Sequence, residues 1–89
     1  MKTYNTKDEL IKDANETRLA NKNNWVVFQA QMNNYILMFK MFDTWVQRLE
    51  VYKTENGTNL IPYFVESSPM ELNVKGFSNW IDEQISTLN

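Results

Sequence analysis

The chain has 89 residues, of which 43% are apolar, 22% charged and 13% aromatic. This length fits one small domain, residues 1–89, and the composition is that of a folded rather than a disordered protein. Cys and His are absent, which excludes disulfide scaffolds, thiol nucleophiles, imidazole bases and the usual zinc ligands. The formal net charge is −2, without the basic excess that nucleic-acid-binding domains show.

The sequence contains no signal for a membrane or for export. No apolar run approaches the length of a membrane-spanning helix. The N-terminal stretch MKTYNTKDEL turns polar where a signal peptide needs an apolar core. We therefore expect a cytoplasmic protein that has no membrane partner.

A helix start signal stands near the N-terminus. Thr6 and Glu9 have the spacing of a capping box, in which Thr6 is the N-cap and Glu9 reaches back to it. The pattern predicts a helix from Thr6 to about Leu19. Its narrow inward stripe consists of Leu10, Ile11, Ala14 and Leu19.

From Trp25 the hydrophobic period changes to two, which is typical of strands. Residues 25–32 and 35–42 then form a hairpin around Asn33-Asn34, because Asn accepts the positive φ that a two-residue turn needs. This register places Phe28 opposite Phe39, and every pair on that face is apolar.

The connection to the next strand has three solutions. A two-residue turn at Asp43-Thr44 would put Val46, Arg48, Glu50 and Tyr52 on the apolar face. A three-residue loop, residues 42–44, would instead place Trp45, Gln47, Leu49 and Val51 there. We prefer the loop because it buries more apolar surface. A short helix capped by Asp43 is the third solution; residues 45–53 would then be helical and the sheet three-stranded.

A second hairpin is predicted at Asn56-Gly57, the strongest short-range turn signal in the chain. A two-residue turn there pairs Val51 with Pro62 and Leu49 with Phe64. Because Pro cannot donate a ladder hydrogen bond, the strand over residues 60–65 should lie at the sheet edge.

The C-terminal segment predicts a second helix. Ser68-Pro69 is a candidate start, and the firm helix should run from Asn73 to Thr87, with Gly76 as a weak point. Its apolar stripe consists of Met70, Val74, Phe77, Ile81, Ile85 and Leu88. Trp80 lies beside this stripe, at the core boundary. The predicted fold is α+β: a helix, a four-stranded antiparallel meander and a helix, and the sheet face that each helix covers stays open.

The sequence carries no recognisable catalytic constellation. Without His or Cys, a hydroxyl or amine nucleophile would need a carboxylate, Lys or Tyr as its base, and no such pairing stands out. The sequence has only two glycines, too few for a phosphate-binding loop or a dinucleotide fingerprint, and neither of them lies in a calcium-loop motif. We therefore expect a protein that is not an enzyme, with no catalytic residue, no metal and no cofactor.

The second face of the predicted sheet is unusually apolar for a solvated one. It collects Trp25, Val27, Ile36, Met38, Phe42, Val46, Tyr52, Ile61, Tyr63 and Val65. Such patches mark interaction surfaces, and aromatic residues anchor them. The candidate protein-binding residues are Trp25, Met38, Phe42, Tyr52 and Tyr63. Three alternatives stay open: a helix covers this face, a terminus covers Trp25 and Phe42, or the face closes a homodimer in a structural or assembly protein.

Nucleic acid is a further alternative partner, through Lys40, Arg48 and Lys53 on neighbouring strands. The order helix, strands, helix resembles that of double-stranded RNA-binding domains. That family has a cluster of Lys at the start of its second helix, whereas residues 68–74 contain none and Lys75 stands alone. The overall charge also disfavours this partner.

In size, composition and coarse architecture the chain resembles small phage or mobile-element accessory proteins, among them anti-CRISPR proteins. The shared features are the short length, the absence of Cys and His, the many Asn residues and the mild acidity. The resemblance implies an inhibitor that blocks a host or phage protein complex by covering its surface, and it assigns no residue roles.

Overall fold

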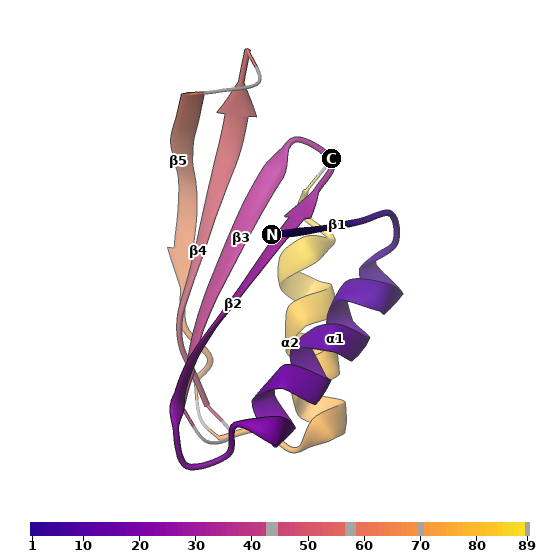
Figure 1. Ribbon diagram of the computed structural model, residues 1–89, viewed down its shortest axis with the longest axis vertical. Coiled ribbons are helices and arrows are strands. Elements are labelled where there is room, and N and C mark those ends of the chain that lie inside the picture. Colours follow the sequence, from indigo (N-terminus) through magenta and orange to yellow (C-terminus); the bar gives the residue numbers. More distant parts are fainter. Residues whose placement is uncertain (43–44, 57–58, 70, 89) are drawn as a thin grey trace.

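The computed structural model describes residues 1–42, 45–56, 59–69 and 71–88 (Figure 1). They form an α+β fold with a mixed five-stranded sheet. In chain order the elements are β1 (Lys2–Tyr4), α1 (Lys7–Ala20), β2 (Trp25–Met32), β3 (Tyr35–Phe42), β4 (Trp45–Glu55), β5 (Asn59–Glu66) and α2 (Val74–Ile85).

The sheet order follows the chain, from β1 to β5. Strands β2 to β5 form the predicted antiparallel meander, and β1 adds a parallel partner to β2. The prediction of a purely antiparallel four-stranded sheet was therefore wrong at this edge. Three residues are too few to display a period of two, so β1 has no sequence signature.

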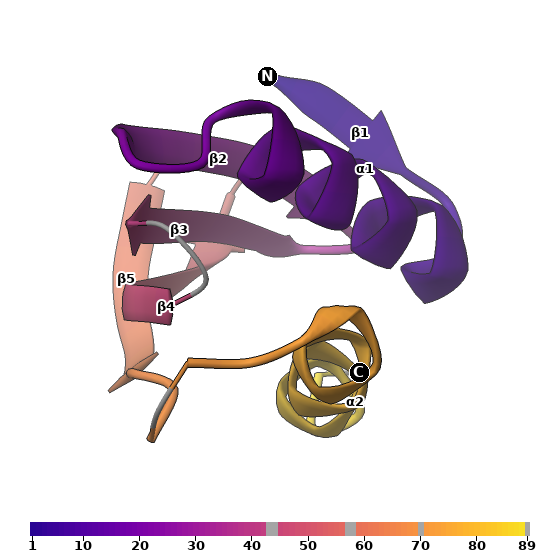
Figure 2. The ribbon, with the colours of Figure 1, turned by 90° about the horizontal axis from the view of Figure 1, so that it is seen from below.

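Both helices lie on the same side of the sheet (Figures 1 and 2), which resolves the question of which face they cover. Helix α1 packs against β1 and β2, and α2 packs beside α1. The core fills the space between the helices and the sheet. Its buried apolar residues are Tyr4, Leu10, Ala14, Phe28, Ala30, Met32, Tyr35, Leu37, Phe39, Met41, Val46, Leu49, Val51, Phe77, Ile81, Ile85 and Leu88.

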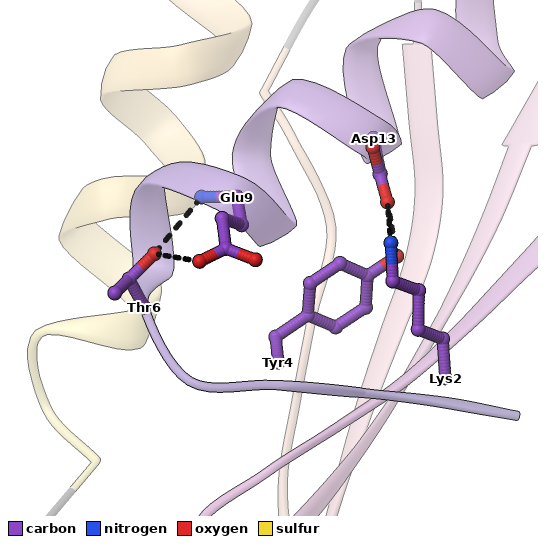
Figure 3. A network of polar contacts seen from close by, with 5 residues as sticks. All are labelled: Lys2, Tyr4, Thr6, Glu9 and Asp13. Carbon is purple, nitrogen blue, oxygen red and sulfur yellow. Dashed lines mark hydrogen bonds and ion pairs between the residues drawn. The ribbon is translucent and has the colours of Figure 1, made fainter.

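Helix α1 begins as predicted. The Thr6 hydroxyl accepts the Glu9 backbone N–H at 3.3 Å and donates to the Glu9 carboxylate at 3.2 Å (Figure 3). Leu10 and Ala14 are buried as expected, and Ile11 is partly buried. Leu19 was wrongly placed in the stripe, because it is half-exposed at the end of the helix.

Polar side chains complete the buried side of α1, which explains its narrow apolar stripe. Arg18 is buried, with Nη1 donating to the Leu72 carbonyl at 2.8 Å and its guanidinium 4.3 Å from the centre of the Phe77 ring. Asn15 donates to the Ser78 hydroxyl at 2.8 Å. These contacts join α1 to α2 and to the segment before it.

Strand β1 is fastened to α1 by a shared carboxylate (Figure 3). The Asp13 carboxylate accepts a hydrogen bond from the Tyr4 hydroxyl at 2.8 Å. It also forms an ion pair with the Lys2 ammonium at 3.2 Å. Burial and the Asp13 carboxylate raise the pKa of Tyr4 to about 12. The same two donors, Tyr4 and Lys2, lower the pKa of Asp13.

The hairpin of β2 and β3 confirms the predicted register, with Phe28 opposite Phe39 and Met32 opposite Tyr35. Asn33 has φ of 55°, the left-handed conformation that the turn was expected to need.

The pairing of β3 with β4 follows the predicted two-residue turn for its first two pairs and then departs from both hairpin predictions. Phe42 faces Trp45 and Met41 faces Val46, but Lys40 faces Arg48, so β4 contains one additional residue at Gln47. This bulge brings Val46, Leu49 and Val51 to the helix side together. The preferred loop correctly placed Leu49 and Val51 on the helix side, but its placement of Trp45 there was wrong, because Trp45 is 39% exposed and pairs with Phe42. Gln47 is the bulge residue and has no partner in the register. The predicted turn residues Asp43 and Thr44 lie outside the described residues, and β4 itself rules out a helix over 45–53.

The pairing of β4 with β5 also differs from the prediction. Glu55 faces Asn59, one residue further along than a two-residue turn allows, and Asn56 has φ of 55°. Gly57, the second predicted turn residue, lies outside the described residues. A bulge at Tyr63 then sets Phe64, rather than Pro62, opposite Val51. The edge position of β5 is confirmed.

Helix α2 starts at the later of the two predicted signals. Asn73 is its N-cap, and its side chain accepts the Gly76 N–H at 2.7 Å. Ser68 is instead buried, where its hydroxyl accepts the Val46 N–H at 3.1 Å. The four inward positions 77, 81, 85 and 88 are confirmed, whereas Val74 is half-exposed.

Two further predictions on the C-terminal segment have separate outcomes. Trp80 is partly buried against the core, as expected of a boundary residue. Met70 lies outside the described residues.

Candidate protein-binding face

The side of the sheet opposite the helices, called the outer face below, has no helix over it (Figures 1 and 2). Its residues follow from the strand registers, because side chains alternate between the two faces and paired residues share one. At one end of the sheet Trp25, Phe42 and Trp45 are successive partners across β2, β3 and β4. These three residues are called the aromatic row.

The aromatic row is exposed to solvent. Trp25 is 65% exposed, Phe42 36% and Trp45 39%. The rings of Trp25 and Phe42 lie with centroids 5.2 Å apart. On the other side, the Trp45 indole donates to the Ser68 carbonyl at 2.8 Å, which fixes the ring at the surface. The row is therefore a fixed apolar strip rather than a set of separate surface residues.

The bulge at Gln47 accounts for the position of Trp45. Without the additional residue, alternation from Leu49 and Val51 would turn Trp45 toward the helices, as the sequence analysis expected. The bulge reverses the alternation, so Val46 is buried and Trp45 faces outward. The spacing of three between Val46 and Leu49, followed by two to Val51, is the sequence signal that could have revealed it.

The other predicted anchor residues are distributed unevenly. Met38 and Tyr52 lie on the outer face and are half-buried. Tyr63 does not join them, because its ring packs against Tyr35 and Phe64 with centroids 5.3 and 5.6 Å away, and those residues belong to the helix side. The predicted set therefore divides between the two faces.

A charged cluster lies at the centre of the outer face. The Glu50 carboxylate accepts the Arg48 Nε–H at 2.7 Å and the Tyr52 hydroxyl, and it lies 3.7 Å from the Lys40 ammonium. The hydrogen bonds from Tyr52 and Arg48 lower the pKa of Glu50, and the one to Glu50 raises the pKa of Tyr52.

The basic strip proposed for nucleic acid is not continuous. Lys40 and Arg48 are register partners on the outer face and share Glu50. Lys53 pairs with Tyr35, whose side chain is in the core, so Lys53 belongs to the opposite side of the sheet. The structure therefore separates Lys53 from the other two cations.

Strand β5 carries a second apolar surface, the run from Leu60 to Val65. In this run Leu60, Ile61, Tyr63 and Val65 are between 44% and 51% exposed. Both helices lie over the other strands, away from β5 (Figures 1 and 2). A continuous apolar run is typical of a strand that is covered on both faces. Strand β5 instead exposes apolar side chains to solvent on both of its faces.

The described residues provide no metal site and no pocket. They form no group of three or more Asp and Glu side chains that could hold a metal ion. The same part of the chain encloses no pocket. None of its helices is long and apolar enough to cross a membrane.

The comparisons with known proteins add no relative. The chain matches no family model, no curated protein and no solved structure.

Proposed function

We propose that the chain is a protein-binding module without enzymatic activity, and that it binds its partner through the outer face with the aromatic row at the centre of the contact. The observation that carries this proposal is the exposure of three large aromatic side chains, side by side on adjacent strands. Trp is among the residues that contribute most to binding energy at protein interfaces.

The fold itself gives no reason for this row. Burying apolar surface stabilises a complex by about 25 cal/mol per Å². The exposed parts of Trp25, Phe42 and Trp45 forgo that gain in the free protein. The indole of Trp45 is also held in place by Ser68, so little side-chain entropy is lost when a partner covers it. A partner would therefore bind an ordered surface, and the entropy cost of binding would be small.

We further propose that binding acts by occlusion: the protein covers a working surface of a host or phage protein complex and so inhibits it. The support is the coarse resemblance to small phage inhibitors. Cytoplasmic location belongs to the same proposal. Inhibition of this kind needs one copy per target and no turnover, which matches a chain without Cys or His.

An affinity capture tests the binding proposal. Tagged wild-type protein is incubated with a nuclease-treated cell lysate, beside Trp25→Glu and two matched controls, Leu19→Glu and Val74→Glu. Both controls place the same charge at half-exposed apolar positions on the helices. We expect a stoichiometric partner with the wild type and both controls, and its loss with Trp25→Glu. Equal recovery by all four proteins would contradict the proposal.

A second candidate function, self-assembly into a homodimer, is favoured by one observation: the exposed apolar run of β5 at the free edge of the sheet. Exposed apolar edge strands tend to find a partner, although Pro62 and the bulge at Tyr63 both weaken edge pairing. Light scattering at micromolar concentration distinguishes the two states. A mass near 10.6 kDa, that of one chain, would exclude this candidate.

A further inference from the structure

A second row of side chains lies beside the aromatic row. Val27, Lys40 and Arg48 are successive register partners on β2, β3 and β4. On β2 and β3 they stand two residues from the aromatic row, which corresponds to about 6.6 Å along a strand. A partner that covers the aromatic row therefore also meets two cations.

The positive side chains of the outer face are more exposed to solvent than its negative one. By strand register, Glu50 is the acidic residue among the described side chains of this face. Its side chain is only 12% exposed, whereas those of Lys40 and Arg48 are 46% and 53% exposed. A guanidinium has five N–H donors, and the bond from Nε to Glu50 uses one of them. The anion is covered while both cations face solvent.

We propose that the partner presents an acidic segment with large apolar side chains to this face. Its apolar side chains would cover Trp25 and Phe42, and its carboxylates would meet Arg48 and Lys40. The spacing of about 6.6 Å between the two rows sets the spacing between the apolar and the acidic side chains of that segment. This inference rests on the proposed function and names the chemistry of its partner.

A single-stranded nucleic acid would also use aromatic side chains and cations. One observation favours the acidic protein segment instead. A nucleic-acid strand carries one phosphate per nucleotide and needs a track of cations along its backbone. Among the described residues of this face Lys40 and Arg48 are the two cations, because Lys53 is on the other side of the sheet, and two neighbouring cations match a few carboxylates better than a phosphate chain. We therefore treat nucleic-acid binding as an outcome of the test.

The test uses a displayed library of random peptides, selected on the immobilised full-length protein. We expect the enriched peptides to combine Asp or Glu with large apolar residues. One enriched peptide is then synthesised and titrated against Lys40→Gln/Arg48→Gln, with Lys53→Gln, which removes one positive charge on the opposite side of the sheet, as the control. Loss of close charge pairs should weaken binding about tenfold or more in the double variant, and less than about twofold in the control.

A salt titration of the wild-type complex provides the same information without any substitution, so misfolding of the double variant cannot decide the test. Binding should weaken as salt rises from low to physiological concentration. Peptides that bind through Trp25 but carry no net negative charge and ignore salt would overturn the acidic partner alone. If Trp25→Ala removes no binding, the proposed function fails as well. Trp25-dependent binding of a labelled oligothymidylate, tighter than that of the peptides, would also overturn the inference.

Discussion

Replacing Phe39 and Trp25 by Ala, each in its own variant, compares the two faces of the sheet. Phe39 is fully buried at the centre of β3, and its ring contacts Phe28 with centroids 5.9 Å apart. Truncation of a buried Phe costs about 3 to 5 kcal/mol of unfolding free energy. A domain of this size has a total of roughly 5 to 13 kcal/mol. Phe39→Ala should therefore remove a large part of the stability.

Trp25→Ala should cost far less, because about two thirds of this residue is in solvent already. The main loss is its ring contact with Phe42, and such aromatic pairs contribute about 0.5 to 1.5 kcal/mol. The difference between the two variants should then be at least about 1.5 kcal/mol.

Urea unfolding followed by far-UV circular dichroism measures both costs. The slope of free energy against urea should be the same for both variants and the wild type, so that midpoints can be compared. If Trp25→Ala destabilised the protein as much as Phe39→Ala, the outer face would be part of the core, and the reasoning about a binding surface would be refuted.

Four further predictions concern the contacts that hold the helices and β1 and the charged cluster of the outer face. Arg18→Met should lower the unfolding free energy by about 1 to 3 kcal/mol for each acceptor left unpaired, and thermal unfolding no different from the wild type would contradict this role. Asn73→Ala removes the N-cap of α2 and should cost about 1 kcal/mol, whereas Asn73→Ser should retain most of it in the same urea assay. The raised pKa of Tyr4 means that its stabilising effect is full below pH 10 and is lost as pH rises toward 12, and Tyr4→Phe should flatten this alkaline loss. The lowered pKa values of Asp13 and Glu50 act in the opposite sense: their effect is present above pH 4.5 and is lost in acid, so unfolding free energy that stays constant from pH 5 to pH 2 would contradict both contacts.

The parts of the fold that the sequence predicted are those governed by local rules. Thr6 and Glu9 form the helix start, because a cap needs only residues three apart. The β2–β3 hairpin follows from its period of two and from Asn33, which adopts the positive φ. The apolar stripe of α2 is likewise a local pattern, and its inward positions from Phe77 to Leu88 were found.

The parts that could not be predicted depend on contacts between distant segments. Arg18 and Asn15 would ordinarily be solvated on a helix surface, and they are buried because α2 and Leu72, more than 50 residues later, pack against them. Strand β1 exists through its pairing with β2 and through Asp13. The bulge at Gln47 exchanges the faces of Val46 and Trp45, so the candidate site gained a residue that a strict alternation placed in the core.

Protection of the aromatic row in the complex tests the central claim most directly. Hydroxyl-radical labelling of the free protein and of its complex with the captured partner reports the accessibility of each Trp by mass spectrometry. Trp80, on α2 and half-buried, serves as an internal reference of the same residue type. The account predicts that Trp25 and Trp45 are labelled in the free protein and protected in the complex, while labelling of Trp80 is unchanged. Protection of Trp80 with continued labelling of Trp25 and Trp45 would place the partner on the helices and contradict the account.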